Sequence, residues 1–250
     1  GGQANTNSTL GSSNFDGTLQ STVKVNALAG FSVIAWRGNG SAGATIGHGL
    51  GVAPQVAIVK RREASEDWHV NVGPILGSGK DGHYLKLNDT DTEGTQNGAF
   101  NSTNPSSTVV TLGSDAATND NAGLMICYAF SEVAGYSKLA SYKGNGNADG
   151  PFVFTSFKPA VIILKNTSTA EDWAIRDIKH SGYTTMNGNP VNIGLRPNTN
   201  AGYTGGSNLG MDFLSNGFKL RGPDNDVNKS GDTYIYLAFA SSPFKNARAR

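Results

Sequence analysis

The chain has 250 residues, of which 33 are glycine and 25 are asparagine, and its formal net charge is +1 at pH 7. Both residue types tolerate the positive φ angles of tight turns, and only 16% of the residues are charged, so the composition favours an all-β protein with many loops. The near-neutral charge argues against nucleic acid as a partner. We also expect no membrane insertion, because no apolar run approaches spanning length.

Residues 1–22 are rich in Gly, Asn, Ser, Thr and Gln and contain few apolar anchors, which predicts a flexible arm or linker. From Val23 onward, short apolar or alternating runs, the first of them Val23–Val25, predict strands, and turn-rich segments separate them. The Asn216-Gly217 pair predicts a hairpin turn. Strands are expected at 31–37, 55–61, 67–72, 83–87, 108–112 and 123–131, and then at 137–143, 151–155, 160–166, 172–177, 191–195, 211–214, 217–221 and 233–240.

Three blocks of sequence occur twice, at offsets of 105 to 109 residues. The repeats relate 36–40 to 142–146, 53–60 to 158–165 and 125–130 to 234–239. A near-constant offset of this length indicates a duplicated domain rather than a solenoid. The predicted fold is all-β, with two tandem, internally duplicated antiparallel β-sandwich (jelly-roll-like) domains. We expect the first sandwich at 23–134 and the second, with a short basic tail, at 135–250.

A tryptophan follows Glu-Asp at the same place in both repeats, as Trp68 and Trp173. Equivalent aromatic residues most simply fill the core between sheets. The alternative is a pair of exposed platforms on which sugar rings stack. Trp68 and Trp173 are therefore the candidate ligand-stacking residues.

The sequence offers little that points to catalysis or metal binding. His48, His69, His83 and His180 lack the spacing of metal ligands, and Cys127 lies in an apolar run where a buried, inert thiol is expected. The acidic stretches 88–93 and 224–228 have the rhythm of calcium loops but are incomplete, so solvated turns are the default. We expect no catalytic, cofactor-binding or metal site, although carboxylates paired in space for glycoside hydrolysis leave no sequence signature.

The Gly-Asn-Gly motifs at 38–40 and 144–146 superficially resemble phosphate loops. They lack the Lys-Ser/Thr that follows in such loops and a helix whose N-terminus could hold an anion. A hairpin turn is therefore the expected structure at both places.

Several segments, taken in order, resemble a module of virion proteins from marine bacteriophages, including cyanophages. They are Gly49–Pro54, Tyr136–Lys138, Gly144–Gly146, Asp149–Val153, Phe213–Arg221, Tyr234–Ala240 and the closing Pro243–Arg250. The resemblance covers roughly residues 20–250 and implies the C-terminal part of a longer structural protein. It brings no catalytic residue with it.

This resemblance implies a non-enzymatic virion protein: a tail fibre, a spike or a head-decoration component. The alternatives are a carbohydrate-binding module that recognises a host receptor glycan, and a glycan-degrading spike enzyme. The expected partners are other virion proteins, and a homo-oligomer is expected, with a trimer as the leading arrangement. The polar arm and the edge strands of a β protein add a physical reason, because both gain from lying against a partner.

Overall fold

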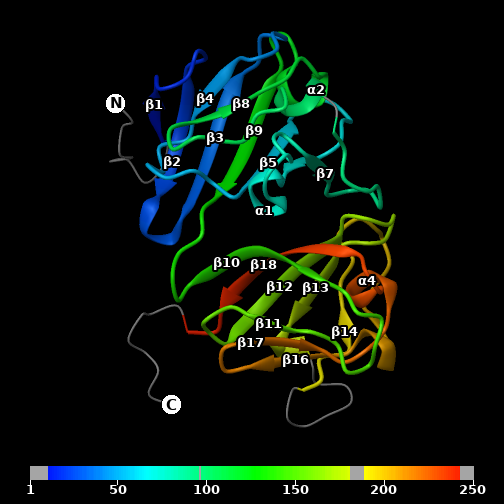
Figure 1. Cartoon of the computed structure of the whole chain (residues 1–250). Helices are drawn as coiled ribbons and strands as arrows, with labels where there is room; N and C mark the ends of the chain where they lie inside the picture. The colour runs from blue at the N-terminus through cyan, green and yellow to red at the C-terminus, as the bar shows by residue number, and fades with distance from the viewer. Residues whose placement is uncertain (1–10, 96, 181–188, 243–250) are drawn as a thin grey trace. The chain divides into compact units, whose positions relative to one another are not determined.

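The computed structural model describes residues 11–95, 97–180 and 189–242. The chain divides into two compact units, one formed by Gly1–Leu87 and Glu93–Glu132 and the other by Asn88–Thr92 and Val133–Arg250 (Figure 1). The main division falls within two residues of the predicted one. The grouping of 88–92 with the second unit was not predicted.

The first unit is built on a seven-stranded antiparallel sheet. In spatial order its strands are β1 (Ser12–Asn14), β2 (Ser21–Asn26), β3 (Phe31–Arg37), β9 (Leu124–Phe130), β5 (Val56–Arg61), β6 (His69–Asn71) and β7 (Tyr84–Lys86). A separate pair joins β4 (Thr45–Gly47) to β8 (Val109–Thr111). The remaining elements are single turns: η1 (Ala27–Ala29), α1 (Gly73–Leu76), α2 (Asn97–Phe100) and α3 (Ala116–Asn119).

Alternation along the strands builds the core of this unit. Every second residue of β3 and of β9 is buried, as expected for strands with one face on a core. Ile34 and Cys127 from the large sheet join Ile46 and Val110 from β4 and β8 in one apolar cluster. The two layers therefore enclose the core in a sandwich-like arrangement.

The predicted arm at 1–22 is wrong for the part that the structure describes. Residues 12–14 pair with β2, the Leu19 amide donates to the Thr45 carbonyl at 2.9 Å, and Asn14 is fully buried. Hydrogen bonds and one packed leucine thus order a segment whose composition is polar. Residues 1–10 lie outside the described residues.

The second unit contains a four-stranded antiparallel sheet and a smaller three-stranded one. The first has the order β10 (Ser137–Lys143), β18 (Thr233–Ala240), β12 (Pro159–Asn166) and β13 (Ala174–Asp177), and the second has the order β11 (Phe152–Phe154), β17 (Gly217–Leu220) and β16 (Met211–Leu214). Short elements complete the unit: β14 (Ile193–Gly194) paired with β15 (Thr204–Gly205), η2 (Ile178–His180), η3 (Ser207–Leu209) and α4 (Asn225–Asn228).

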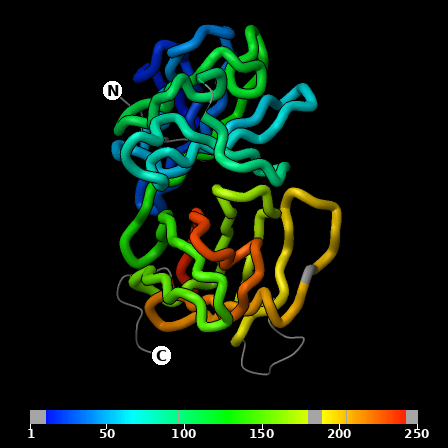
Figure 2. The backbone as a smooth tube through the Cα atoms, turned by 45° about the vertical axis from the view of Figure 1, so that its right-hand side comes forward, coloured from blue at the N-terminus to red at the C-terminus, as the bar shows by residue number. Residues whose placement is uncertain are grey.

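Both sheets of this unit contribute to one core, in which Leu164 and Tyr236 meet Phe213 and Phe218. Figures 1 and 2 show the first and last strands, β10 and β18, running side by side. The hairpin predicted at Asn216 joins β16 to β17, but Leu214 pairs with Gly217. The turn residues are therefore Ser215 and Asn216, and the glycine already belongs to the strand.

The two units share a strand order. β3-β9-β5-β6 in the first corresponds to β10-β18-β12-β13 in the second, and the pair β4-β8 corresponds to β11-β17. Each corresponding strand lies 103 to 109 residues further along the chain. The all-β class and most predicted strands are confirmed, whereas β1, β4 and β15 were not predicted.

Candidate functional site

A buried asparagine binds the Gly-Asn-Gly loop in each unit. In the first, the Asn119 side chain donates to Asn39 Oδ1 at 3.1 Å and to the carbonyls of Ser41 and Gly113 at 3.0 and 3.1 Å, while its own Oδ1 accepts from the Asn39 amide at 3.0 Å. In the second, Asn228 makes the equivalent bonds to Asn145. We call these two arrangements the asparagine staples.

The glycines of each motif are explained by this geometry. A Cβ on Gly38 would lie 2.2 Å from the Asp120 carbonyl oxygen, and one on Gly144 would lie 2.2 Å from that of Lys229. Gly40 and Gly146 have φ angles of 68° and 67°, which favour glycine. The predicted hairpin turns are wrong, because each loop bonds to the turn before β9 or β18 instead of reversing its own strand.

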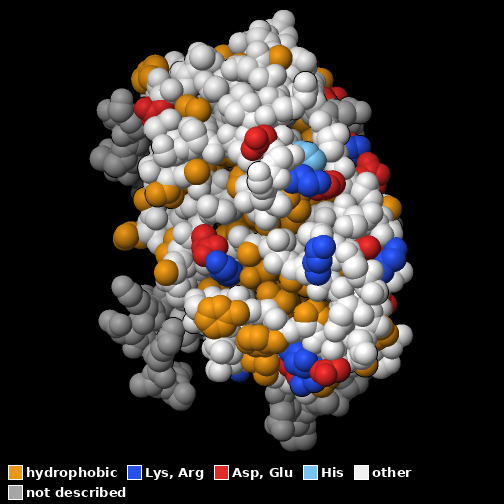
Figure 3. Space-filling model, in the orientation of Figure 1, with side chains coloured by type: hydrophobic (Ala, Val, Ile, Leu, Met, Phe, Trp, Pro, Cys, Tyr) orange, Lys and Arg blue, Asp and Glu red, His pale blue; other side chains and the backbone are white. Residues whose placement is uncertain are grey.

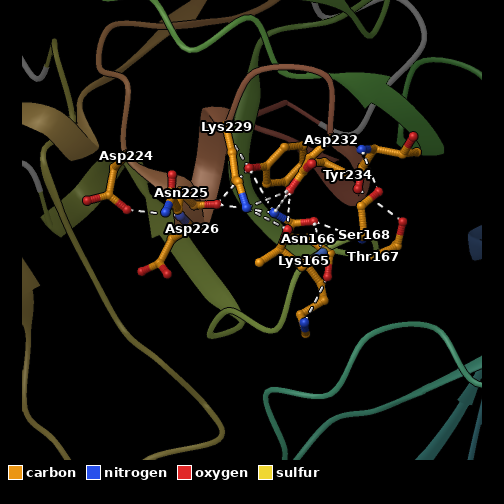
Figure 4. Close-up of polar contacts among 12 residues, drawn as sticks. Lys165, Asn166, Thr167, Ser168, Asp224, Asn225, Asp226, Lys229, Asp232 and Tyr234 are labelled. Atoms are coloured by element: carbon orange, nitrogen blue, oxygen red, sulfur yellow. Dashed lines mark hydrogen bonds and ion pairs between the residues drawn. The ribbon is translucent and has the colours of Figure 1, made fainter.

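A cluster of hydrogen-bonded polar side chains lies in the second unit, where the end of β12 meets α4 and β18 (Figure 4). Asn166 is fully buried; its amide nitrogen donates to Asp232 Oδ2 at 2.9 Å and to Tyr234 Oη at 3.1 Å. Its oxygen accepts the amides of Ser168 and Thr169. The cluster thereby fixes the loop that follows β12.

Tyr234 extends this cluster to α4. Its hydroxyl donates to the Asn225 carbonyl at 2.6 Å and accepts the Lys229 amide at 2.7 Å. Burial raises the pKa of this phenol above its ordinary range, so the hydroxyl stays protonated and can donate. At Asp232, burial opposes ionisation, but hydrogen bonds from Thr169 and Asn166 leave the pKa lowered.

Lys165 is a fully buried cation beside this cluster. Its ammonium group donates to the carbonyls of Asn166 at 2.8 Å and Thr90 at 3.0 Å. Burial lowers its pKa to about 8, although carboxylates nearby, Glu171 foremost, act in the opposite direction. Carbonyl oxygens solvate the charge here in place of water.

A group of ionised side chains continues along the same end of the unit. Arg196 forms ion pairs with Asp172 at 2.9 Å and with Asp226. Burial raises the pKa of Asp226, and Arg196 counteracts that shift. Arg176 is 2% exposed on the core side of β13, and its Nε has no hydrogen-bond partner among the described residues.

The two tryptophans have different surroundings. Trp173 is only 2% exposed, so it offers no open face on which a sugar could stack. Trp68 is half-buried and stacks on Tyr128, with ring centroids 6.4 Å apart. The stacking interpretation is therefore wrong for Trp173, and only Trp68 retains accessible surface.

The histidines and the cysteine have structural surroundings. His48 is fully buried; its Nδ1 accepts the Leu50 amide, its Nε2 lies 3.2 Å from the Ser106 carbonyl oxygen, and burial lowers its pKa. His69 is also buried with a lowered pKa. Cys127 is buried as predicted, and burial raises the pKa of its thiol. The side chain of His180 lies outside the described residues.

In both acidic stretches, carboxylate side chains bind other groups of the protein. Asp224 caps α4 by accepting the Asp226 amide at 2.9 Å, and Glu93 pairs with Lys80 and His83. Across 11–95, 97–180 and 189–242, no group of three or more His, Cys, Asp or Glu residues is placed to hold a metal ion. No helix in the described part of the chain is long and apolar enough to span a membrane.

Sequence reasoning missed the asparagines that organise the staples. Asn119 and Asn228 each follow a helix-capping aspartate by four residues, Asp115 and Asp224, at the same 109-residue offset. That shared Asp-x-x-x-Asn spacing is the signal that could have found them. The hydrogen bonds of the two asparagines join the Gly-Asn-Gly loops to the turns before β9 and β18.

A family model described as Domain of unknown function (DUF7483) matches residues 4–243. Neither the curated proteins nor the solved structures yield a match.

Proposed function

Since the chain belongs to the DUF7483 family, whose description assigns no activity, we propose from the residues themselves that it is a non-enzymatic structural component of a bacteriophage virion. A tail fibre, a spike and a head decoration are the forms considered, and the virion is its location. The observation that carries the proposal is the use of polar groups: the asparagine staples and the cluster around Asn166 hold loops in place. Rigid loops on short strands suit a particle component exposed to the surroundings.

We further propose that the two units are copies of one antiparallel β-sandwich of jelly-roll-like form. The shared strand order and the matching asparagine staples support this duplication. Superposition of the two units in an experimental structure tests it: Pro54 should fall on Pro159 and Trp68 on Trp173. Unrelated chain paths between these markers would refute the duplication.

Proteomics of purified particles tests the virion assignment. Peptides of this chain should remain with particles of the phage that encodes it through density-gradient banding, and antibodies against the chain should label the particle by electron microscopy. Recovery of the chain only from the soluble lysate would refute the proposal. A homo-oligomer, with a trimer as the leading arrangement, is proposed as well; light scattering on the protein together with particle symmetry tests that part.

Carbohydrate recognition is the second candidate function, and the accessible part of Trp68 is the observation that favours it. A glycan array probed with the wild-type chain and with Trp68→Ala tests it. Glycan binding that disappears in the variant at unchanged stability would support this function. Release of reducing ends from a host polysaccharide would instead indicate the third alternative, a glycan-degrading enzyme.

A further inference from the structure

The second unit has an open sheet edge that carries two exposed aromatic side chains. Strand β11 lies at the edge of its three-stranded sheet; Phe152 is 45% exposed and Phe154 59%, while Val153 between them points into the core at 7%. Figure 3 shows hydrophobic side chains at the surface of this unit. Large apolar side chains on an unprotected edge are unusual, because such edges readily pair with other chains.

The backbone of β11 also presents hydrogen-bonding groups to this edge. On the inner side, the Leu220 amide donates to the Pro151 carbonyl at 3.2 Å and the Thr155 amide donates to the Asn216 carbonyl at 3.0 Å. Since alternate residues of an antiparallel strand face the same neighbour, the amides and carbonyls of Phe152 and Phe154 point away from β17. They have no hydrogen-bond partner within the described ranges.

The first unit shows what covers the corresponding edge. Strand β4 has the same pattern on its inner side, with the Leu112 amide donating to the Ala44 carbonyl at 2.8 Å and the His48 amide to the Thr108 carbonyl at 3.2 Å. Its outward-facing residues are therefore Thr45 and Gly47, which correspond to Phe152 and Phe154.

Those outward-facing groups are occupied by the extended segment Thr18–Ser21. The Leu19 amide donates to the Thr45 carbonyl at 2.9 Å, the Thr45 amide donates to Thr18 Oγ1 at 2.9 Å, and Ser21 Oγ donates to the Gly47 carbonyl at 2.9 Å. The leucine side chain packs against the core. One backbone amide, two hydroxyls and one apolar side chain are thus sufficient to cover the edge.

The second unit has no such segment before its first strand. In the first unit, the ordered chain from Gly11 to Asn26 precedes β3, whereas β10 begins at Ser137, only four residues after the unit starts at Val133. A cover for β11 must therefore come from elsewhere. β11 itself carries no charge, and Lys219 and Arg221 nearby are paired with Asp149 and Asp212.

We propose that the open edge of β11 is a docking site for an extended segment of another polypeptide chain, which adds a strand to the sheet. The charge pattern and the cover on β4 define the partner: a near-neutral peptide with Ser or Thr hydroxyls and one leucine-sized side chain. Backbone bonds to Phe152 and Phe154 would supply register, and the two rings would pack against the added strand. The site stands on this geometry whether or not the chain belongs to a virion.

The test uses a fluorescent peptide with the sequence of residues 11–22, titrated with the whole protein and followed by anisotropy. Saturable binding is expected. Phe154→Pro removes an outward-facing amide and should weaken binding about tenfold or more. The control Tyr203→Ala removes an exposed aromatic side chain of the same unit that lies outside β11, and its binding should stay within about threefold of the wild type. Loss of peptide binding in Phe154→Pro would also show that the peptide binds at β11 and not at β4, since β4 is unchanged in that variant.

A second probe keeps the test decisive if Phe154→Pro does not fold. The same peptide with an N-methyl group on its Leu19 nitrogen lacks the donor that the docking needs, and it should bind the wild-type protein about tenfold more weakly. Equal binding of both peptides, or no saturation at about 1 mM, would overturn the proposal. Self-association that disappears in Phe154→Pro without any peptide binding would assign the edge to a second copy of β11 and would overturn the proposed partner.

Discussion

Truncation of a staple asparagine should destabilise its own unit strongly. Asn228 is fully buried, and its Nδ2 lies 3.1 Å from Asn145 Oδ1, 2.8 Å from the Asn147 carbonyl oxygen and 3.0 Å from the Gly222 carbonyl oxygen, while its Oδ1 accepts the Asn145 amide at 2.9 Å. The amide nitrogen has only two hydrogens, so these three acceptors share two donated bonds. Two donated bonds and one accepted bond, at about 1 kcal/mol for each net hydrogen bond, predict a cost of about 3 kcal/mol for Asn228→Ala. That is a large fraction of the roughly 5–15 kcal/mol by which a domain is stable.

Native-state hydrogen exchange measures this loss for each unit separately, because peptides from β12 and β18 report on the second unit and peptides from β3 and β9 on the first. Asn119→Ala should produce a loss of similar size in the first unit, since its bonds are the same. The matched control is Asn208→Ala, which removes an exposed amide that forms no side-chain hydrogen bond with the described residues. A loss below about 1 kcal/mol in both staple variants would refute the reasoning.

Four further outcomes follow from the structure. Trp173→Ala should cost about 3–5 kcal/mol in urea unfolding, whereas Trp68→Ala should cost less than half as much because Trp68 is half-buried. Burial lowers the pKa of Lys165 from 10.5 to about 8. Between these two pH values the folded chain binds fewer protons than the unfolded chain, so the free energy of unfolding should rise with pH by up to roughly 3 kcal/mol. The variant Lys165→Met should lack that rise. Burial also lowers the pKa of His48 below 6.5, so the free energy of unfolding should fall as the pH drops below 6.5. NMR of the folded protein near pH 6.5 should show a neutral His48 imidazole, and a fully protonated ring at that pH would contradict this. Added chelator should leave the melting temperature unchanged, because the Asp224 carboxylate of the calcium-like stretch accepts a backbone amide and caps α4. A fall of several degrees on adding chelator would reveal a bound metal.

The long strands are predicted because each is an apolar or largely apolar run between turn-rich segments. In the structure, burial alternates along both 31–37 and 124–130, although residues 124–130 are apolar at every position, so the sequence predicts the strand but not which face is buried. β4 is missed because Thr45–Gly47 stands in a glycine-rich stretch with a single apolar residue. Local pattern carries no information on a strand that depends on partners far away in the sequence.

The polar sites are harder to predict because their partners are distant. Asn39 and Asn119 are 80 residues apart, and Asn145 and Asn228 are 83 apart. No spacing rule joins such pairs. The burial of Trp173, in contrast, could be expected from its place after an apolar strand, since large aromatic side chains usually fill the interior between sheets.

The grouping of residues 88–92 with the second unit means that this unit is not encoded by one continuous stretch. The carbonyl of Thr90, which accepts a hydrogen bond from the buried ammonium group of Lys165 at 3.0 Å, is synthesised 75 residues earlier than that lysine. During translation, residues 88–92 therefore leave the ribosome before the strand that they bind, β12, has been synthesised. A gene fragment that starts at Val133 would encode a lysine deprived of one of its two carbonyl partners, so recombination at that boundary would transfer an incomplete unit.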